Sequence, residues 1–218
     1  MERYFQTELN DLKINLLKMA SMVEKALSDS LKAFNRRDEK LAEEVIKGDE
    51  EINEMEVQID RQCLSLLARY QPMASDLRFI TAAMRINFDL ERIGDQAVNI
   101  AERVVELAKR PPLMCCPDEL SYIAEIAIDM VTQAVNAFVY KDPDLAIKVC
   151  KRDDEVDDLR DAIFVKLLDF MITHTPAVKR GAHLIIVTRC WERVGDHATN
   201  IAEHVVFFLE GRIIRHIY

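Results

Sequence analysis

Apolar residues recur every three or four positions along most of the chain, which is the spacing of one face of an α-helix. Two segments that lie 104 positions apart show the same spacing of 3, 4 and 3 residues. They are Leu16, Met19, Val23 and Ala26, and Leu120, Ile123, Ala127 and Met130. Spacings of this kind form apolar seams between long packed helices. The pattern therefore predicts a protein built from long amphipathic helices.

The chain also contains an internal repeat. Segment 91–102, ERIGDQAVNIAE, recurs at 192–203 as ERVGDHATNIAE, with nine of twelve residues identical at an offset of 101. Upstream the halves match at an offset of 104, and a deletion of three residues after Pro176, the equivalent of Pro72, explains the change. Each half is therefore one copy of the same unit. The expected boundaries are a first unit at 1–110, a linker at 111–117 and a second unit at 118–218.

Each unit is predicted to contain three helices. Asp38 and Asp142 precede the two middle helices as N-caps, and Pro143 sits at a first helical position. Short connections make consecutive helices antiparallel. The prediction is an all-α fold of two pseudo-symmetric up-down-up three-helix bundles. Its six long helices are expected at 2–35, 39–69, 75–109, 118–140, 143–172 and 177–210.

Composition narrows the class of protein. The chain has 218 residues, half of them apolar, and only 5 Gly and 6 Pro, which is too few for glycine-loop nucleotide folds or turn-rich sandwiches. The formal charge of -9 argues against nucleic-acid binding, which needs a basic face. No apolar run approaches the ~20 residues of a membrane span, and there is no signal-peptide core. We therefore expect a cytoplasmic protein without membrane insertion.

The five cysteines are an odd number and lack Cys-x-x-Cys spacing, which fits a reducing compartment. The adjacent pair Cys115 and Cys116 is expected to be inert, although a redox or metal role stays open.

The repeated segment carries a stripe of oxygen-bearing side chains. At about 100° per residue, the four side chains of each stripe fall within about 80° of helix surface. They are Glu91, Asp95, Asn99 and Glu102, and Glu192, Asp196, Asn200 and Glu203. Carboxylates spaced i,i+4 repel each other by a few tenths of a kcal/mol, which solvent, an arginine or a cation can offset. An ordinary solvated helix face is the plainest alternative.

The middle helices bring further carboxylates to the height of the stripes. In an antiparallel hairpin, residues equidistant from the turn face each other, so Asp49 faces Asp95 and Asp153 faces Asp196. Glu56 and Asp157 of the middle helices also lie at the height of the stripes. Facing carboxylates repel unless they share a cation or a proton. Oxygen-rich clusters suit Mg, Mn, Ca or Fe ions, and Zn also stays open. Metal ligands are therefore predicted on the two stripes together with Asp49 and Asp153.

A glycine stands inside each stripe-bearing helix, at Gly94 and Gly195. A mid-helix glycine costs about 1 kcal/mol relative to alanine. Its presence at the same place in both units predicts the close approach of another backbone.

The doubled Glu-Arg-Ile-Gly-Asp-x-Ala-x-Asn-Ile-Ala-Glu segment resembles the PhoU family of phosphate-signalling accessory proteins, and residues 48–53 and 152–157 also fit that family. The resemblance covers nearly the whole chain. It implies negative regulation of the phosphate-starvation response and of high-affinity phosphate uptake. It also implies two partners, the ATPase of the phosphate ABC transporter and a sensor histidine kinase. Some members bind metal clusters through Glu/Asp-x-x-x-Asp motifs. By motif match these would be Glu91 with Asp95 and Glu192 with Asp196.

Other interpretations remain. A ferritin-like di-metal oxidoreductase or metal store would use Glu-x-x-His, but no Glu precedes any of the five His by three residues. A purely structural helical scaffold without metal is the third possibility. No nucleotide-loop, zinc-protease or serine-hydrolase signature occurs, so we expect a non-enzymatic protein. Seams of this kind commonly self-associate, which predicts a homodimer.

The two stripes need not be equivalent. Cys190 stands in the second unit where the first has Asp89, and Gln96 and Arg103 are replaced by histidines. These histidines, His197 and His204, are either ligands or surface residues beside an acidic patch.

Overall fold

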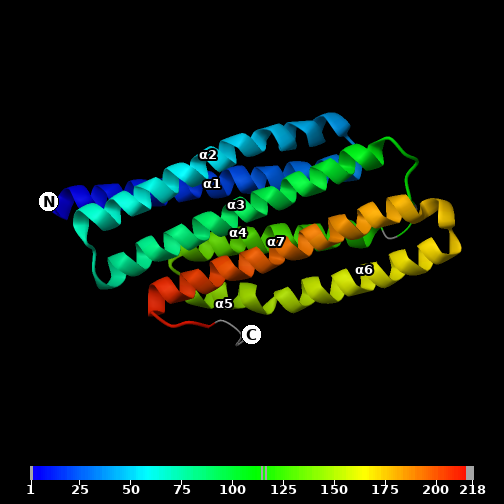
Figure 1. Cartoon of the computed structure of the whole chain (residues 1–218). Helices are drawn as coiled ribbons and strands as arrows, with labels where there is room; N and C mark the ends of the chain where they lie inside the picture. Colours follow the sequence, from blue (N-terminus) through cyan, green and yellow to red (C-terminus); the bar gives the residue numbers. More distant parts are fainter. Residues whose placement is uncertain (1, 114, 116, 215–218) are drawn as a thin grey trace.

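The computed structural model describes residues 2–113, 115 and 117–214, and all regular structure in those residues is helical (Figure 1). The first unit consists of α1 (Glu2–Arg36), α2 (Glu39–Tyr70) and α3 (Ala74–Ala108). The second consists of α4 (Pro117–Tyr140), α5 (Pro143–Lys151), α6 (Asp153–Thr173) and α7 (Val178–Glu210), with a short 3₁₀ turn, η1 (Thr175–Ala177), before α7. The predicted pair of up-down-up helical bundles is confirmed.

Local sequence explains where the middle helices begin. The side chain of Asp38 accepts hydrogen bonds from the backbone N–H groups of Lys40 and Leu41, and that of Asp142 accepts one from Leu145. These bonds satisfy N–H groups that a helix start leaves without a partner. Both predicted N-caps are confirmed.

The middle helix of the second unit is interrupted, and the prediction of one helix over 143–172 is wrong at this point. Arg152 separates α5 from α6. Its N–H donates to Val149 O at 3.0 Å, and the N–H of Glu155 donates to Arg152 O at 3.1 Å. These bonds span three residues, so the backbone tightens into a 3₁₀ turn. The Arg152 side chain pairs with Asp129 of α4 at this break.

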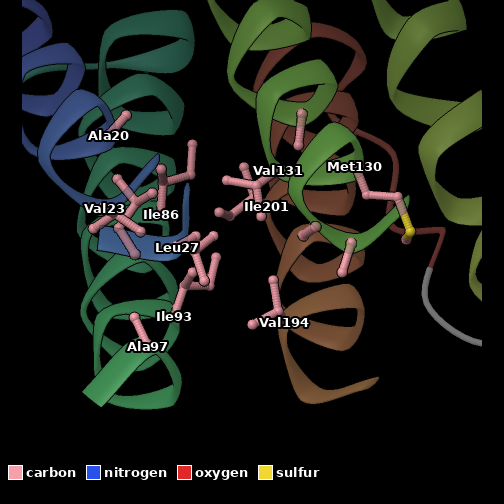
Figure 2. Close-up of a cluster of buried hydrophobic side chains, with 14 of the residues drawn as sticks. Ala20, Val23, Leu27, Ile86, Ile93, Ala97, Met130, Val131, Val194 and Ile201 are labelled. Atoms are coloured by element: carbon pink, nitrogen blue, oxygen red, sulfur yellow. The ribbon is translucent and has the colours of Figure 1, made fainter. Parts of the chain in front are cut away.

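The two units share one core rather than two separate ones. The stripe-bearing helices α3 and α7 run antiparallel beside each other at the centre of the molecule (Figure 1). Figure 2 shows buried side chains of α1 and α3 meeting those of α4 and α7. The labelled members are Ala20, Val23, Leu27, Ile86, Ile93, Ala97, Met130, Val131, Val194 and Ile201. Each unit thus buries part of its apolar surface against the other, which fixes the position of the two stripes relative to each other.

One helix departs from the expectation that no segment is long and apolar enough to span a membrane. Residues 118–140 of α4 are long and apolar enough to cross a membrane by length and composition, with a mean hydropathy of 1.2. Half of the 18-residue window with this hydropathy is buried inside the bundle.

The cysteines described in the structure are free. Cys63, Cys150 and Cys190 are buried, and burial raises the pKa of each thiol, to about 12, about 12 and about 11 respectively. Cys115 is partly exposed, and Cys116 lies outside the described residues, so the idea of a functional cysteine pair stays a prediction.

Candidate functional site

Asp49 of α2 lies against Gly94 of α3, as the hairpin argument predicts. A Cβ added at Gly94 would lie 3.6 Å from Asp49 Oδ1 and 3.4 Å from two carbons of Ile52. The predicted close approach is therefore made by side chains rather than by backbone. The glycine leaves room beside the Asp49 carboxylate.

Two carboxylate oxygens of the first unit are buried and lack hydrogen bonds. Asp49 Oδ2 accepts from Asn53 Nδ2 at 2.8 Å, but Asp49 Oδ1 has no hydrogen-bond partner. Glu91 Oε2 is also without one, although Arg92 Nε lies 3.3 Å away. Burial raises the pKa of both carboxyl groups, and the charge of Asp95 raises both further. The first acid cluster, Asp49, Glu91 and Asp95, thus carries negative charge that the protein only partly compensates.

The second unit repeats this arrangement. A Cβ added at Gly195 would lie 3.4 Å from Asp153 Oδ1. Burial, and then the charge of Asp196, raises the pKa of Asp153 to about 6. Burial, followed by the charge of Glu192, likewise raises the pKa of Asp196. The second acid cluster, Asp153, Glu192 and Asp196, differs in holding a cross-helix ion pair, because Arg160 Nη1 lies 2.7 Å from Glu192 Oε1.

The other residues of the predicted stripes have surroundings or partners of their own. Glu102 is exposed and pairs with Arg103 at 2.8 Å, and Asn99 is half-buried. Asn200 Nδ2 donates to Asp89 Oδ1 at 3.2 Å. Glu203 is half-buried beside Cys150, whose thiol pKa its charge helps to raise after burial. The structure therefore brings Asp49, Glu91 and Asp95 together, and Asp153, Glu192 and Asp196, and it places Glu203 near the same Cys150 thiol as Asp153.

In the described residues, neither acid cluster forms a complete metal site by itself. Among residues 2–113, 115 and 117–214, no group of three or more His, Cys, Asp or Glu side chains is in place to hold one. The unpartnered oxygens of Asp49 and Glu91, and the space beside Gly94, nevertheless fit a small oxygen-binding cation. A cation there would satisfy Asp49 Oδ1, which is costly to leave unpaired, and would add to the charge that Arg92 already supplies to Glu91.

Sequence reasoning missed a buried polar cluster between the two units. His197 Nδ1 lies 2.9 Å from Asp89 Oδ1, and His204 Nε2 lies 3.4 Å from Asp89 Oδ2. Burial alone would raise the pKa of Asp89, but hydrogen bonds to the two histidines outweigh it and lower the pKa. His204 is only 4% exposed, so the interpretation of it as a surface histidine is wrong.

The signal for this cluster was present in the repeat. Asp89, His197 and His204 all occupy positions at which the two units differ. The sequence pattern suggests properties of two separate stripes, whereas the structure places all three residues where α3 meets α7, so that they link the two units.

Comparison with known proteins gives matches over nearly the whole chain. A family model described as the PhoU domain matches residues 16–104 and 120–205. A protein of Aquifex aeolicus, named phosphate-specific transport system accessory protein PhoU homolog, is 42% identical over 96% of this chain and 94% of its own length. A protein of the same name from Pseudomonas aeruginosa is 38% identical over 100% of this chain and 90% of its own length.

Two crystal structures have the same fold. PhoU from Pseudomonas aeruginosa has a TM-score of 0.94 at 38% identity, covering 95% of this chain and 100% of that one. The phosphate transport system regulatory protein PhoU from Streptococcus pneumoniae has a TM-score of 0.88 at 27% identity, covering 96% and 98%.

Proposed function

The chain belongs to the PhoU family, and on that premise we propose that it is a non-enzymatic regulatory accessory protein of phosphate transport. In this proposal it restrains high-affinity phosphate uptake and represses the phosphate-starvation response. It acts in the cytoplasm, between the ATPase of the phosphate ABC transporter and a sensor histidine kinase. The proposal rests on the observation that each of the two units matches the PhoU domain.

An adaptor needs exposed surface that can bind other proteins, and α6 offers one. Phe164, Val165, Leu168 and Ile172 are large apolar side chains that stay exposed along this helix. Exposed apolar residues gathered on one element are typical of protein-binding surfaces. We therefore expect contact with the transporter ATPase to involve α6.

Co-purification tests this proposal. The tagged protein should retain the transporter ATPase of its own organism. Ile172→Glu should weaken that retention, because a buried charge at an apolar interface is costly. Ile14→Glu is the matched control, since Ile14 is also exposed but lies on α1. Failure of the unmodified protein to retain either the ATPase or the kinase would contradict the adaptor role.

We further propose that divalent or ferric cations bind the two acid clusters. The ions would be held by Asp49, Glu91 and Asp95 in the first unit and by Asp153, Glu192 and Asp196 in the second. When bound, a cation supplies positive charge that lets carboxylates of adjacent helices share one site. The unpartnered Asp49 and Glu91 oxygens support this proposal.

Elemental analysis tests the cation proposal directly. Protein purified without chelators is expected to carry Fe, Mn, Mg, Ca or Zn. The double variant Asp95→Asn, Asp196→Asn should lose it while keeping its helical circular dichroism. Absence of bound metal, together with absence of binding on titration, would contradict the proposal.

A ferritin-like di-metal oxidoreductase is not favoured. Such sites combine carboxylates with histidine on facing helices. Here His197 and His204 contact Asp89 rather than either acid cluster. Measurable ferroxidase activity of the iron-loaded protein would reverse this preference.

A further inference from the structure

The exposed apolar residues of α6 are not a property of the repeated unit. At the offset of 104, three of them stand where α2, the equivalent helix of the first unit, has a charged or a small side chain. They are Phe164, Val165 and Ile172, in place of Asp60, Arg61 and Ala68. These three residues of α6 are 45%, 55% and 68% exposed. Because the equivalent helix packs without such groups, the fold does not require them, and their exposure points to a contact with another molecule.

Carboxylates continue the same face of α6 towards its N-terminus. At about 100° per residue, the carboxylates and the apolar side chains fall within about 100° of the helix surface, and Phe164 lies at the edge of this arc. The members of this α6 face, all exposed, are Asp154, Asp158, Val165, Leu168, Asp169 and Ile172. From its first to its last member the α6 face extends about 27 Å along the helix.

α6 carries more negative charge than its own cations balance. The helix has seven Asp or Glu residues and two basic ones, Arg160 and Lys166. Arg160 pairs with Asp157 and Asp161, and Lys166 pairs with Glu119 of α4, so both cations are directed at other carboxylates. The carboxylates of the α6 face therefore present negative charge at the surface. Such a surface repels an anionic membrane and attracts a cationic partner.

A cleft beside Phe164 has room for a large side chain of a partner. It has a volume of about 340 Å³ and lies between α6 and α7. Ile185 lines it together with Phe164, and the charged residues around them are two of each sign. They are Arg160, Arg189, Asp161 and Glu192. A side chain that fills such a pocket next to exposed apolar residues contributes much of the binding energy of an interface.

We propose that the α6 face binds a positively charged amphipathic helix of a partner protein. Apolar side chains of that helix pack on Phe164, Leu168 and Ile172, and its Lys or Arg side chains meet Asp154 and Asp158. A helix of about 18 residues matches the length of the face, and it can present apolar and cationic side chains at the same helical spacing. The inference rests on the proposed contact of α6 with the transporter ATPase and adds the chemistry of the segment that binds there.

The experiment measures the binding of fluorescently labelled 18-residue peptides to the full-length protein by anisotropy. The probes are a Leu/Lys peptide with its leucines on one helical face, a shuffled peptide of the same composition, and the Leu/Glu analogue of the first. The amphipathic Leu/Lys peptide should bind at least about tenfold more tightly than the shuffled one, because only it offers both kinds of contact at once. The Leu/Glu peptide should not bind, and 0.5 M salt should weaken the Leu/Lys complex.

Neutral variants test the acidic part of the α6 face. Asp154→Asn together with Asp158→Asn should weaken binding of the amphipathic Leu/Lys peptide about threefold to tenfold, because two exposed ion pairs are lost. Glu50→Gln together with Glu54→Gln is the matched control. These residues are the exposed equivalents on α2, and the change in net charge is the same.

Exchange of residues between the units tests the apolar part. The triple variant Phe164→Asp, Val165→Arg, Ile172→Ala gives α6 the residues of α2 and leaves the net charge unchanged. It should weaken binding of the Leu/Lys peptide at least about tenfold, because the apolar contact is removed. Circular dichroism establishes that the variant folds. If it does not, Ile172→Ala alone should weaken binding about threefold, with Ile14→Ala on α1 as its control.

Equal binding of the amphipathic and shuffled peptides, or equal effects of the α2 and α6 double variants, would overturn this inference alone, since retention of the ATPase on co-purification decides the adaptor role separately. A dimer that the triple variant converts to a monomer would show that the face binds a second copy of this chain. Binding to phosphatidylglycerol vesicles that the triple variant loses would show that it binds a membrane. Either result would also overturn the inference.

Discussion

Replacing Asp153 by asparagine should stabilise the protein when no cation is present. The pKa of Asp153 is raised from 3.8 to about 6 by burial and by the charge of Asp196, so keeping it ionised costs folding free energy. Two pKa units correspond to about 3 kcal/mol at most. Because the side chain is only partly buried, screening reduces this to about 1–2 kcal/mol. Asparagine keeps nearly the same shape and removes the charge.

The pH dependence of this effect has a definite sign. A carboxyl group whose pKa is higher in the folded than in the unfolded protein binds its proton more tightly when folded. Its contribution to stability is fully present below pH 3.8 and is lost as the pH rises through about 6. Asp153→Asn should therefore gain about 1–2 kcal/mol over the unmodified protein at pH 7.5, and the gain should shrink towards zero near pH 4.

Urea unfolding in the presence of a chelator, at pH 7.5 and at pH 4.5, measures this difference. Asp158→Asn is the control, because it makes the same change in net charge at an exposed position of α6. The reasoning is refuted if Asp153→Asn is no more stable than Asp158→Asn at pH 7.5, or if its advantage is equal at the two pH values.

Three further changes test other parts of the account. Asp89→Ala should lower the free energy of unfolding by about 2–4 kcal/mol, because it leaves His197 and His204 without their buried acceptor. The pKa of Asp89 is lowered in the fold, so the unmodified protein should lose this contribution as the pH falls below 3.8 through that lower pKa. Equal acid unfolding of the two proteins would contradict the prediction. Gly94→Ala should leave the protein as stable or up to about 1 kcal/mol more stable, because alanine has the higher helix propensity. It should nevertheless weaken cation binding, because its Cβ fills the space beside Asp49. Gly48→Ala is the control, since a Cβ there would meet nothing within 4 Å, and it should gain stability without affecting binding. Light scattering on the eluting protein should give twice the chain mass of 25.2 kDa if it forms the expected homodimer, and a monomer at micromolar concentration would contradict that expectation.

The helical bundles and the facing carboxylates could be predicted from the sequence because both depend on local periodicity. The apolar seams fix which face of each helix is buried, and the short turns fix which helices are neighbours. The hairpin argument that places Asp49 opposite Asp95 uses only distance from a turn. Applied to Arg160 and Glu192, whose midpoint is Pro176, it would also have found their ion pair.

The remaining features depend on tertiary contacts that periodicity does not describe. The tightened turn between α5 and α6 is an exception with a local signal, because Lys148 and Lys151 lie in the last turn of α5 and Asp153, Asp154 and Glu155 in the first turn of α6, charges that favour a helix end and a helix start. The contact of Asp89 with His197 and His204 requires α3 of one unit to pack against α7 of the other. A comparison of the two repeated sequences does not show how the units pack against each other. These three residues are therefore visible in the sequence only as differences between the units.

Deletion of the gene is the sharpest test of the proposed restraint of phosphate uptake and of the starvation response. The measurement is phosphate uptake and expression of phosphate-starvation genes in phosphate-rich medium. We expect both to rise in the deletion strain and to return to normal when the unmodified gene is restored. Uptake and expression that stay unchanged after deletion would contradict it.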